Sequence, residues 1–369
     1  MTRNPFALGT AALLLVATGA GSAAVASHLV ATDPASTTSA ATTEVPTQPA
    51  VPTTPYVRRQ SYVPETTGQA ATDATAEQST GIVEISSTLT NGTGAGTGLV
   101  LDSDGTVVTN HHVVEGATSI EVTVVSTGRT YEARYVGANP TTDVAVLQLE
   151  DASGLTPVDL SDTPAAVGDE ITAVGDAGGD GGSLTASPGT VSALHDDITV
   201  ESTDGSGGTA LTDLIRMDAY VVPGDSGGAV LDADGDVVGM NVAASSGSGQ
   251  VTGYAIPIAT VEQVVAQIEA GDEGNGVELG YDGYLGVALD PSATAPLVVE
   301  VTEGSAAARA GIAAGDTVTK VDGTAVGTTE ELRAAIAGHD AGARVTVTWT
   351  TTAGGTESAT VTLGEAPIS

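Results

Sequence analysis

The stretch PGDSGGAVL at residues 223–231 places a serine among glycines, directly before an apolar run that is typical of a β-strand. A serine hydroxyl is a weak nucleophile, so it needs a base that takes its proton and donors that stabilise an oxyanion. Glycines allow backbone amides to converge without a Cβ atom in the way. The stretch makes Ser226 a candidate nucleophile and the amides of Gly224 and Ser226 candidate oxyanion donors, although Gly-Asp-Ser-Gly is also an ordinary loop sequence.

The base must be sought among only five histidines. His111 and His112 lie in TNHHVV at 109–114, directly after a predicted strand, and residue chemistry alone does not choose between them. The other three occupy the apolar N-terminal segment, an acidic loop and a predicted helix end, where solvated or capping roles are expected: His28, His195 and His339.

A carboxylate that could orient the base stands in TTDVAVL at 141–147. Asp143 opens an apolar strand there, and burying its charge is costly without a partner. The plainer interpretation is a charge at a strand edge, because the chain has 46 acidic residues. Asp143 is therefore a candidate that gains weight only in combination with the histidine and the serine.

Residues 79–271 alternate short β-branched runs with Gly, Asp and Asn turns, such as Asp102–Gly105 and Asp232–Asp236. Many short strands at this spacing predict an all-β barrel or sandwich. One amphipathic helix is predicted at 258–268, where apolar residues recur at i, i+3, i+4 and i+7 and stop before Gly271.

The regions outside 79–271 differ in character. Residues 1–30 combine a basic start with an apolar run and predict either a cleaved signal peptide or an uncleaved membrane anchor. Residues 31–78 are rich in Thr, Pro and Ala and predict a disordered linker. An acidic, Gly-rich linker is predicted at 272–282, and mixed strand and helix patterns at 283–369 predict a small α+β domain.

Composition excludes several function classes. The formal net charge is −36, which repels phosphate backbones, so no nucleic-acid partner is expected. No cysteine is present, which removes disulfides, thiolate metal sites and a cysteine nucleophile. The glycines at 92–96 have no βαβ context for a dinucleotide, and the acids at 232–236 lack the glutamate that a calcium loop needs at its twelfth position. We therefore predict no cofactor and no metal.

Taken together, the motifs resemble the HtrA (Deg) family of trypsin-fold serine proteases. The resemblance rests on GTGLVL at 96–101, TNHHVV at 109–114, the segment leading to Asp143, the serine loop, and GYAIPI at 253–258. In this family the catalytic histidine precedes Val-Val, which selects His112. The order His112, Asp143, Ser226 along the chain is that of chymotrypsin-like enzymes.

The C-terminal domain resembles a PDZ domain. YLGV at 284–287 is similar to the loop whose amides capture a peptide C-terminus, which implies peptide binding by Tyr284, Leu285, Gly286 and Val287. The expected fold is therefore mainly β, with a two-barrel trypsin-like protease domain followed by a small α+β PDZ domain.

The resemblance implies an exported, ATP-independent serine endopeptidase that acts on misfolded or specific extracytoplasmic proteins. Its expected partners are unfolded or C-terminally exposed polypeptides, with membrane anchoring through the N-terminus if the signal is not cleaved. The family often forms trimers, so a homotrimer is a further expectation for which no individual residue can be named. The alternatives are a PDZ-based peptide-binding chaperone or stress sensor with a dormant protease core and, with less support, a hydrolase of non-peptide esters.

Two departures from the family limit the transfer of residue roles. The family usually has Asn before the nucleophile, where this chain has Asp225. Digestive trypsin-like enzymes pair such an Asp with a new N-terminal amine, but the similar start at Gly81 is expected to be a first strand here. Tyr220 stands six residues before Ser226, where enzymes that cleave after Arg or Lys carry an aspartate. Tyr220 is therefore a candidate for the specificity pocket, with small aliphatic residues expected at the cleavage site, or it serves packing.

Overall fold

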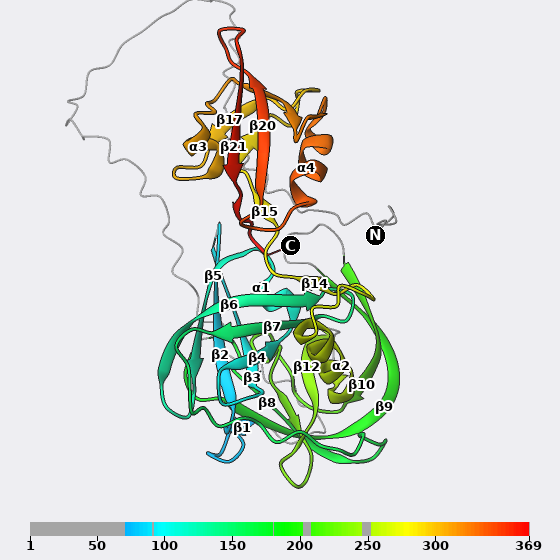
Figure 1. The fold of residues 1–369 in the computed structure, drawn as a ribbon. Helices are drawn as coiled ribbons and strands as arrows, with labels where there is room; N and C mark the ends of the chain where they lie inside the picture. Colours follow the sequence, from blue (N-terminus) through cyan, green and yellow to red (C-terminus); the bar gives the residue numbers. More distant parts are fainter. Residues whose placement is uncertain (1–70, 91, 180, 202–207, 246–251, 369) are drawn as a thin grey trace, which may run out of the picture. The chain divides into compact units, whose positions relative to one another are not determined.

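The computed structural model describes residues 71–90, 92–179, 181–201, 208–245 and 252–368 (Figure 1). The predicted signal peptide or anchor lies outside the described residues, as does most of the predicted linker at 31–78. Ordered structure begins before residue 79, because strand β1 (Thr72–Asp73) pairs with Thr185 and Ala186. Within the described residues, no helix is long and apolar enough to cross a membrane.

The first half of the protease region forms a closed, antiparallel barrel. Its strand order is β6-β5-β2-β3-β4-β7, and a further pairing between β7 and β6 closes the ring. The strands are β2 (Ile82–Leu89), β3 (Gly92–Val100), β4 (Thr106–Thr109), β5 (Ala117–Val124), β6 (Arg129–Asn139) and β7 (Val144–Leu149), with the short β14 (Glu278–Leu279) on the outer edge of β6. The pattern of period two is clear in β5, where Ile120, Val122 and Val124 are buried and Glu121 is exposed.

The second half repeats this architecture. The order β9-β10-β13-β12-β11-β8 closes through a β8–β9 pairing. The strands are β8 (Glu170–Gly175), β9 (Thr185–Glu201), β10 (Gly208–Met217), β11 (Ala229–Leu231), β12 (Val237–Ser245) and β13 (Thr252–Pro257). The predicted two-barrel fold is thus confirmed. The segment at Ile82 is the second strand, not the first, because β1 precedes it.

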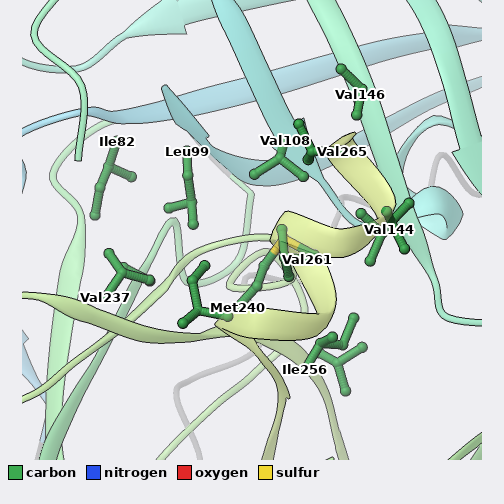
Figure 2. Close-up of a cluster of buried hydrophobic side chains, with 14 of the residues drawn as sticks. Ile82, Leu99, Val108, Val144, Val146, Val237, Met240, Ile256, Val261 and Val265 are labelled. Atoms are coloured by element: carbon green, nitrogen blue, oxygen red, sulfur yellow. The ribbon is translucent and has the colours of Figure 1, made fainter. Parts of the chain in front are cut away.

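One buried cluster joins the two barrels (Figure 2). It combines Ile82, Leu99 and Val108 from the first barrel with Val237, Met240 and Ile256 from the second. The helix α2 (Ile258–Glu269) adds Val261 and Val265 to the same cluster, as its predicted apolar stripe requires. Each of these eight side chains is at most 8% exposed. Because apolar burial is the main favourable term in folding, this cluster fixes the two barrels against each other and sets the frame for any site between them.

The C-terminal region is a small α+β domain with its own core. A four-stranded sheet has the order β19-β18-β20-β21, and two short strand pairs, β15–β22 and β16–β17, complete it. The elements are β15 (Gly283–Tyr284), β16 (Val287–Leu289), β17 (Val298–Val301), α3 (Ala306–Ala310), β18 (Thr317–Val321), β19 (Thr324–Ala325), α4 (Thr329–Ala337), β20 (Arg344–Thr350), β21 (Thr356–Thr362) and β22 (Gly364–Glu365). Trp349, the one tryptophan of the chain, is 1% exposed in this core.

Candidate active site

His112 lies on α1 (His111–Val114), a single turn that follows β4 at the end of the first barrel. Its ring Nδ1 is 2.7 Å from Asp143 Oδ2, and its backbone N–H donates to Asp143 Oδ1 at 2.9 Å. With Nδ1–H donating to the carboxylate, Nε2 is the ring nitrogen left to accept a proton. His111 is buried beside it, and the Asp143 carboxylate contacts the ring of His112.

Asp143 also bonds to the residues around His112, not only to the ring of His112. Its backbone oxygen accepts from His111 N at 3.2 Å and from Asn110 Nδ2 at 3.1 Å. Asp143 adopts a φ of 56°, a left-handed conformation that is uncommon for a residue other than glycine. Such strain persists where surrounding bonds impose it, and here it directs both carboxylate oxygens at His112.

The electrostatics of His112 favour its protonated form. Burial lowers the pKa of His112, but the charge and hydrogen bond of Asp143, with the charge of Glu115, outweigh burial and raise the pKa above its ordinary value. Only 6% of the Asp143 side chain is exposed, against 30% for His112, so the carboxylate acts on the ring with little solvent screening.

Ser226 lies in a tight loop that leads into β11. Asp225 N donates to Val222 O at 3.0 Å and Gly228 N donates to Asp225 O at 2.9 Å, so two consecutive turns surround the serine. Gly224 and Gly227 have φ values of 104° and 83°. A Cβ atom would lie 2.1 Å from Asp176 O at Gly224 and 2.0 Å from Thr97 O at Gly227, so the loop can pack this closely only with glycine.

The serine loop packs against the segment that carries the histidine. A Cβ atom at Gly227 would be 2.4 Å from Thr109 Oγ1, three residues before His112. Gly96 lies between Val113 of α1 and the backbone oxygen of Ser226. Ser226 is 7% exposed. Among the described residues, however, no hydrogen bond joins Ser226 Oγ to His112.

The amides of Gly224 and Ser226 are available as donors. Within the part of the chain that the structure describes, neither N–H donates to a protein acceptor. Backbone amides that are held in place and unused are the groups that can stabilise a tetrahedral oxyanion.

Thr97, in the quoted segment GTGLVL, bonds to this loop through its N–H and its hydroxyl. Its N–H donates to Ser226 O at 2.8 Å, and its hydroxyl donates to Gly224 O at 2.7 Å. The same hydroxyl accepts from Asp176 N at 3.0 Å, while Thr97 O accepts from Thr109 Oγ1 at 2.7 Å. Sequence reasoning missed this role, because a threonine in an apolar strand gives no sign of partners more than a hundred residues away.

Asp225 is buried next to the nucleophile. It is 4% exposed, its Oδ2 accepts from Val222 N at 2.8 Å, and its Oδ1 has no partner among the described residues. Burial, only partly offset by the bond from Val222 N and reinforced by the charge of Asp176, raises the pKa of Asp225 to about 7. Among the described residues, no amine is recorded at Asp225, and Ile82 begins strand β2.

The remaining candidates bond to residues outside the serine loop. Tyr220 is half-buried, and its N–H donates to Ser187 Oγ at 2.7 Å. His195 lies in β9, not in a loop, and its exposed ring bonds to Asp213, while His339 Nε2 is 3.5 Å from Asp322 Oδ2. Asp232 Oδ1 accepts from the amides of Asp234 and Asp236, which closes the predicted β11–β12 hairpin.

The PDZ-like segment 284–287 forms a bend between β15 and β16. Tyr284 OH bonds to Thr302 Oγ1 at 3.1 Å, and Leu285 is 3% exposed with its oxygen accepting from Ala307 N. Gly286 has a φ of 82° and packs against Ser305, which leaves no room for a side chain. Val287 then begins β16, whose one ladder partner in the described structure is β17.

Comparison with known families agrees with this architecture. Residues 96–240 match the trypsin-like peptidase domain, and residues 283–363 match the PDZ domain. A probable periplasmic serine endoprotease, DegP-like, from Bartonella henselae is 38% identical over 253 residues, which is 64% of this chain and 46% of the relative. The periplasmic serine endoprotease DegP of Escherichia coli K12 is 34% identical over 252 residues, or 64% of this chain and 50% of the relative. The serine protease PepD of Mycobacterium tuberculosis is 33% identical over 255 residues, or 64% of this chain and 53% of the relative.

These matches define a trypsin-like peptidase domain followed by a PDZ domain. The chain belongs to the HtrA/DegP family of trypsin-like serine proteases with one C-terminal PDZ domain. The chain spans about half the length of these curated relatives.

Proposed function

We propose that the chain is a serine endopeptidase whose triad is His112, Asp143 and Ser226. The observation that carries the proposal is the double contact of Asp143 with His112, on the turn after Thr109, whose hydroxyl lies against Gly227 of the serine loop. An isolated aspartate or histidine would serve many roles. A carboxylate that fixes the histidine tautomer beside a glycine-framed serine supports nucleophilic acyl transfer.

In the proposed mechanism His112 Nε2 accepts the Ser226 proton while Ser226 Oγ attacks the scissile carbonyl. Asp143 stabilises the imidazolium, and the amides of Gly224 and Ser226 donate to the oxyanion. His112 then gives its proton to the leaving amine, which departs and leaves an ester on Ser226. A water molecule, deprotonated by His112, hydrolyses this ester and restores the serine.

The direct test is hydrolysis of fluorescently labelled casein, an unfolded polypeptide. Ser226→Ala should abolish hydrolysis, because no other group supplies the nucleophile, and Asp143→Asn should lower kcat by on the order of 10³–10⁴-fold. Ser119→Ala is the matched control, since Ser119 is exposed on β5. Unchanged hydrolysis by Ser226→Ala would overturn the assignment.

We further infer that the C-terminal domain binds polypeptide C-termini at the segment 284–287. The support is the left-handed bend at Gly286 followed by β16, a strand that can accept an added peptide strand on its unpaired side. Anisotropy measurements with a peptide ending in a free carboxylate and with its amidated form provide the test. Equal affinity for the two peptides would contradict carboxylate capture.

The proposed substrates are misfolded or specific extracytoplasmic proteins. Two of the compared relatives are named periplasmic proteases, and the N-terminal segment predicts export by either a cleaved signal or an anchor. Tyr220 is proposed to face the side chain before the cleaved bond, with a preference for small aliphatic residues. Sequencing the peptides released from casein tests this preference, and sedimentation of the mature protein tests the expected homotrimer.

A second candidate function is a peptide-binding chaperone or stress sensor with a dormant protease core. The observation in its favour is that Ser226 Oγ makes no hydrogen bond to His112 in the described structure. The two functions differ in reactivity towards a fluorophosphonate probe. Labelling without any peptide supports a resting active protease, whereas labelling only after addition of a peptide with a free C-terminus supports the dormant core.

A further inference from the structure

The carboxyl group of Asp225 is the most unusual buried acid in the described structure. It is 4% exposed, receives one hydrogen bond, from Val222 N to Oδ2, and leaves Oδ1 without a donor. Gly175 packs directly against it, and a Cβ atom there would lie 2.8 Å from Asp225 Oδ1. An ionised carboxylate in such a place loses its hydration and receives little in return.

Among the described residues, no cation acts on the Asp225 carboxyl group. The charged group that bears on Asp225 from the elements packed against it is Asp176, which follows β8 and carries the same sign. Asp176 is itself buried, with Oδ2 accepting from Gly181 N at 3.2 Å. The charge of Asp176 opposes ionisation of Asp225, and Asp225 Oδ1 has no donor to offset it.

We propose that Asp225 is a positioning residue of the nucleophile loop that works in its neutral, protonated form, so that its ionisation switches the site off as the pH rises. The proposal rests on the proposed serine protease function. In the neutral form, Oδ2 holds Val222 N and thereby the turn that sets Gly224 and Ser226.

Ionisation would act on the reaction in two ways. A negative charge directly before Ser226 would repel the oxyanion that develops beside it, and this repulsion is strong where water is excluded. The unsatisfied carboxylate would also compete for nearby donors, and the unused amides of its own loop are those of Gly224 and Ser226. Both effects remove stabilisation from the transition state while substrate binding elsewhere is left intact, so kcat should fall more than KM rises.

The test is the pH profile of casein hydrolysis by the full wild-type chain and by its Asp225→Asn variant. The amide of this variant resembles the neutral acid in shape and does not ionise. Because the pKa of Asp225 is about 7, wild-type activity should be lost above neutral pH. At pH 9 the variant should then exceed wild type by about 100-fold in kcat/KM, because the neutral fraction falls tenfold per pH unit. Asp234→Asn removes an exposed charge in the next hairpin and should leave the profile of wild type unchanged. Coincident profiles for wild type and Asp225→Asn would overturn the proposal, as would a folded Asp225→Asn that is inactive at every pH.

A second measurement does not depend on activity. An acid that holds its proton more tightly in the folded state stabilises the fold at pH values below the pKa of the unfolded carboxyl. This contribution is lost as the pH rises through the raised pKa of Asp225, about 7. Urea unfolding should therefore show wild type losing stability relative to Asp225→Asn between pH 4 and 8, and a constant difference would contradict a neutral Asp225. If neither protein hydrolyses casein or reacts with a fluorophosphonate at any pH, the proposed function fails, and the unfolding data still decide the protonation of Asp225.

Discussion

Thr97 bonds to both parts of the proposed active site, the serine loop and the segment that carries His112. Its hydroxyl and amide bond to the serine loop, and its carbonyl accepts the hydroxyl of Thr109 at the end of the histidine-bearing segment. Thr97 is 0% exposed, so none of these bonds competes with solvent. A single buried side chain therefore sets where Gly224 lies relative to the first barrel.

Substitutions of Thr97 can remove the hydroxyl while keeping the volume of the side chain. Thr97→Val keeps the volume but leaves Gly224 O without its donor and Asp176 N without its acceptor, which costs about 1–3 kcal/mol for each buried group. We expect a drop in kcat of at least about tenfold with a smaller change in KM, and recovery in Thr97→Ser. Steady-state kinetics of casein hydrolysis check this, and a Thr97→Val enzyme with wild-type kcat would contradict the positioning role.

The raised pKa of His112 predicts the acidic limb of the pH profile. The general base must be neutral, so activity should fall as the pH decreases through a value above the ordinary pKa of histidine. Asp225→Asn is the suitable background, because it removes the proposed alkaline loss. Asp143→Asn removes the charge that raises the pKa, so its residual activity should extend to lower pH. If the acidic limb of the pH profile lies at the same pH with and without Asp143→Asn, then Asp143 does not set the pKa of His112.

At the scale of elements, the serine loop depends on close approach to β3. Gly227→Ala places a Cβ atom 2.0 Å from Thr97 O, whereas Gly235→Ala, at a φ of 94°, meets nothing within 4 Å. Both variants carry the cost of a left-handed alanine, about 1 kcal/mol, but only Gly227→Ala also displaces the loop. Gly227→Ala should lose fluorophosphonate labelling while Gly235→Ala keeps it. Equal labelling of the two would show that the loop tolerates displacement.

The elements themselves were largely predictable, because they rest on local patterns. The helix expected at 258–268 is observed at Ile258–Glu269. The strand and turn pattern that precedes this helix predicted the barrels. Contacts between segments that are distant along the chain cannot be recognised in local sequence patterns. The bonds from Thr97 to Gly224 and the burial of Asp225 against Gly175 depend on how β3 and β8 meet the loop before β11, which periodicity does not encode.

At the scale of the whole molecule, acidic charge dominates. Residues 79–271 contain 27 acidic and 3 basic residues, and residues 272–369 contain 14 and 4. Such an excess keeps a protein soluble but destabilises the folded state through self-repulsion. Because the acidic excess is spread over both domains, we interpret it as a general property of the surface and not as a binding patch.

Salt should therefore stabilise the protein by screening. The Debye length falls from about 30 Å at 0.01 M to about 10 Å at 0.1 M, so most of the increase in Tm should occur in this range. A scan of Tm against NaCl concentration tests this prediction. An increase that occurs only near molar salt would indicate a general salting-out effect, and a decrease would contradict self-repulsion.

The central claim is that Ser226 is a nucleophile activated by His112. The most direct measurement is mass spectrometry of the full chain after reaction with a fluorophosphonate, with the adduct mapped to a peptide. We expect one adduct, on Ser226, whose formation is lost in His112→Ala and strongly slowed in Asp143→Asn. An adduct on another residue, or equal labelling of wild type and His112→Ala, would contradict it.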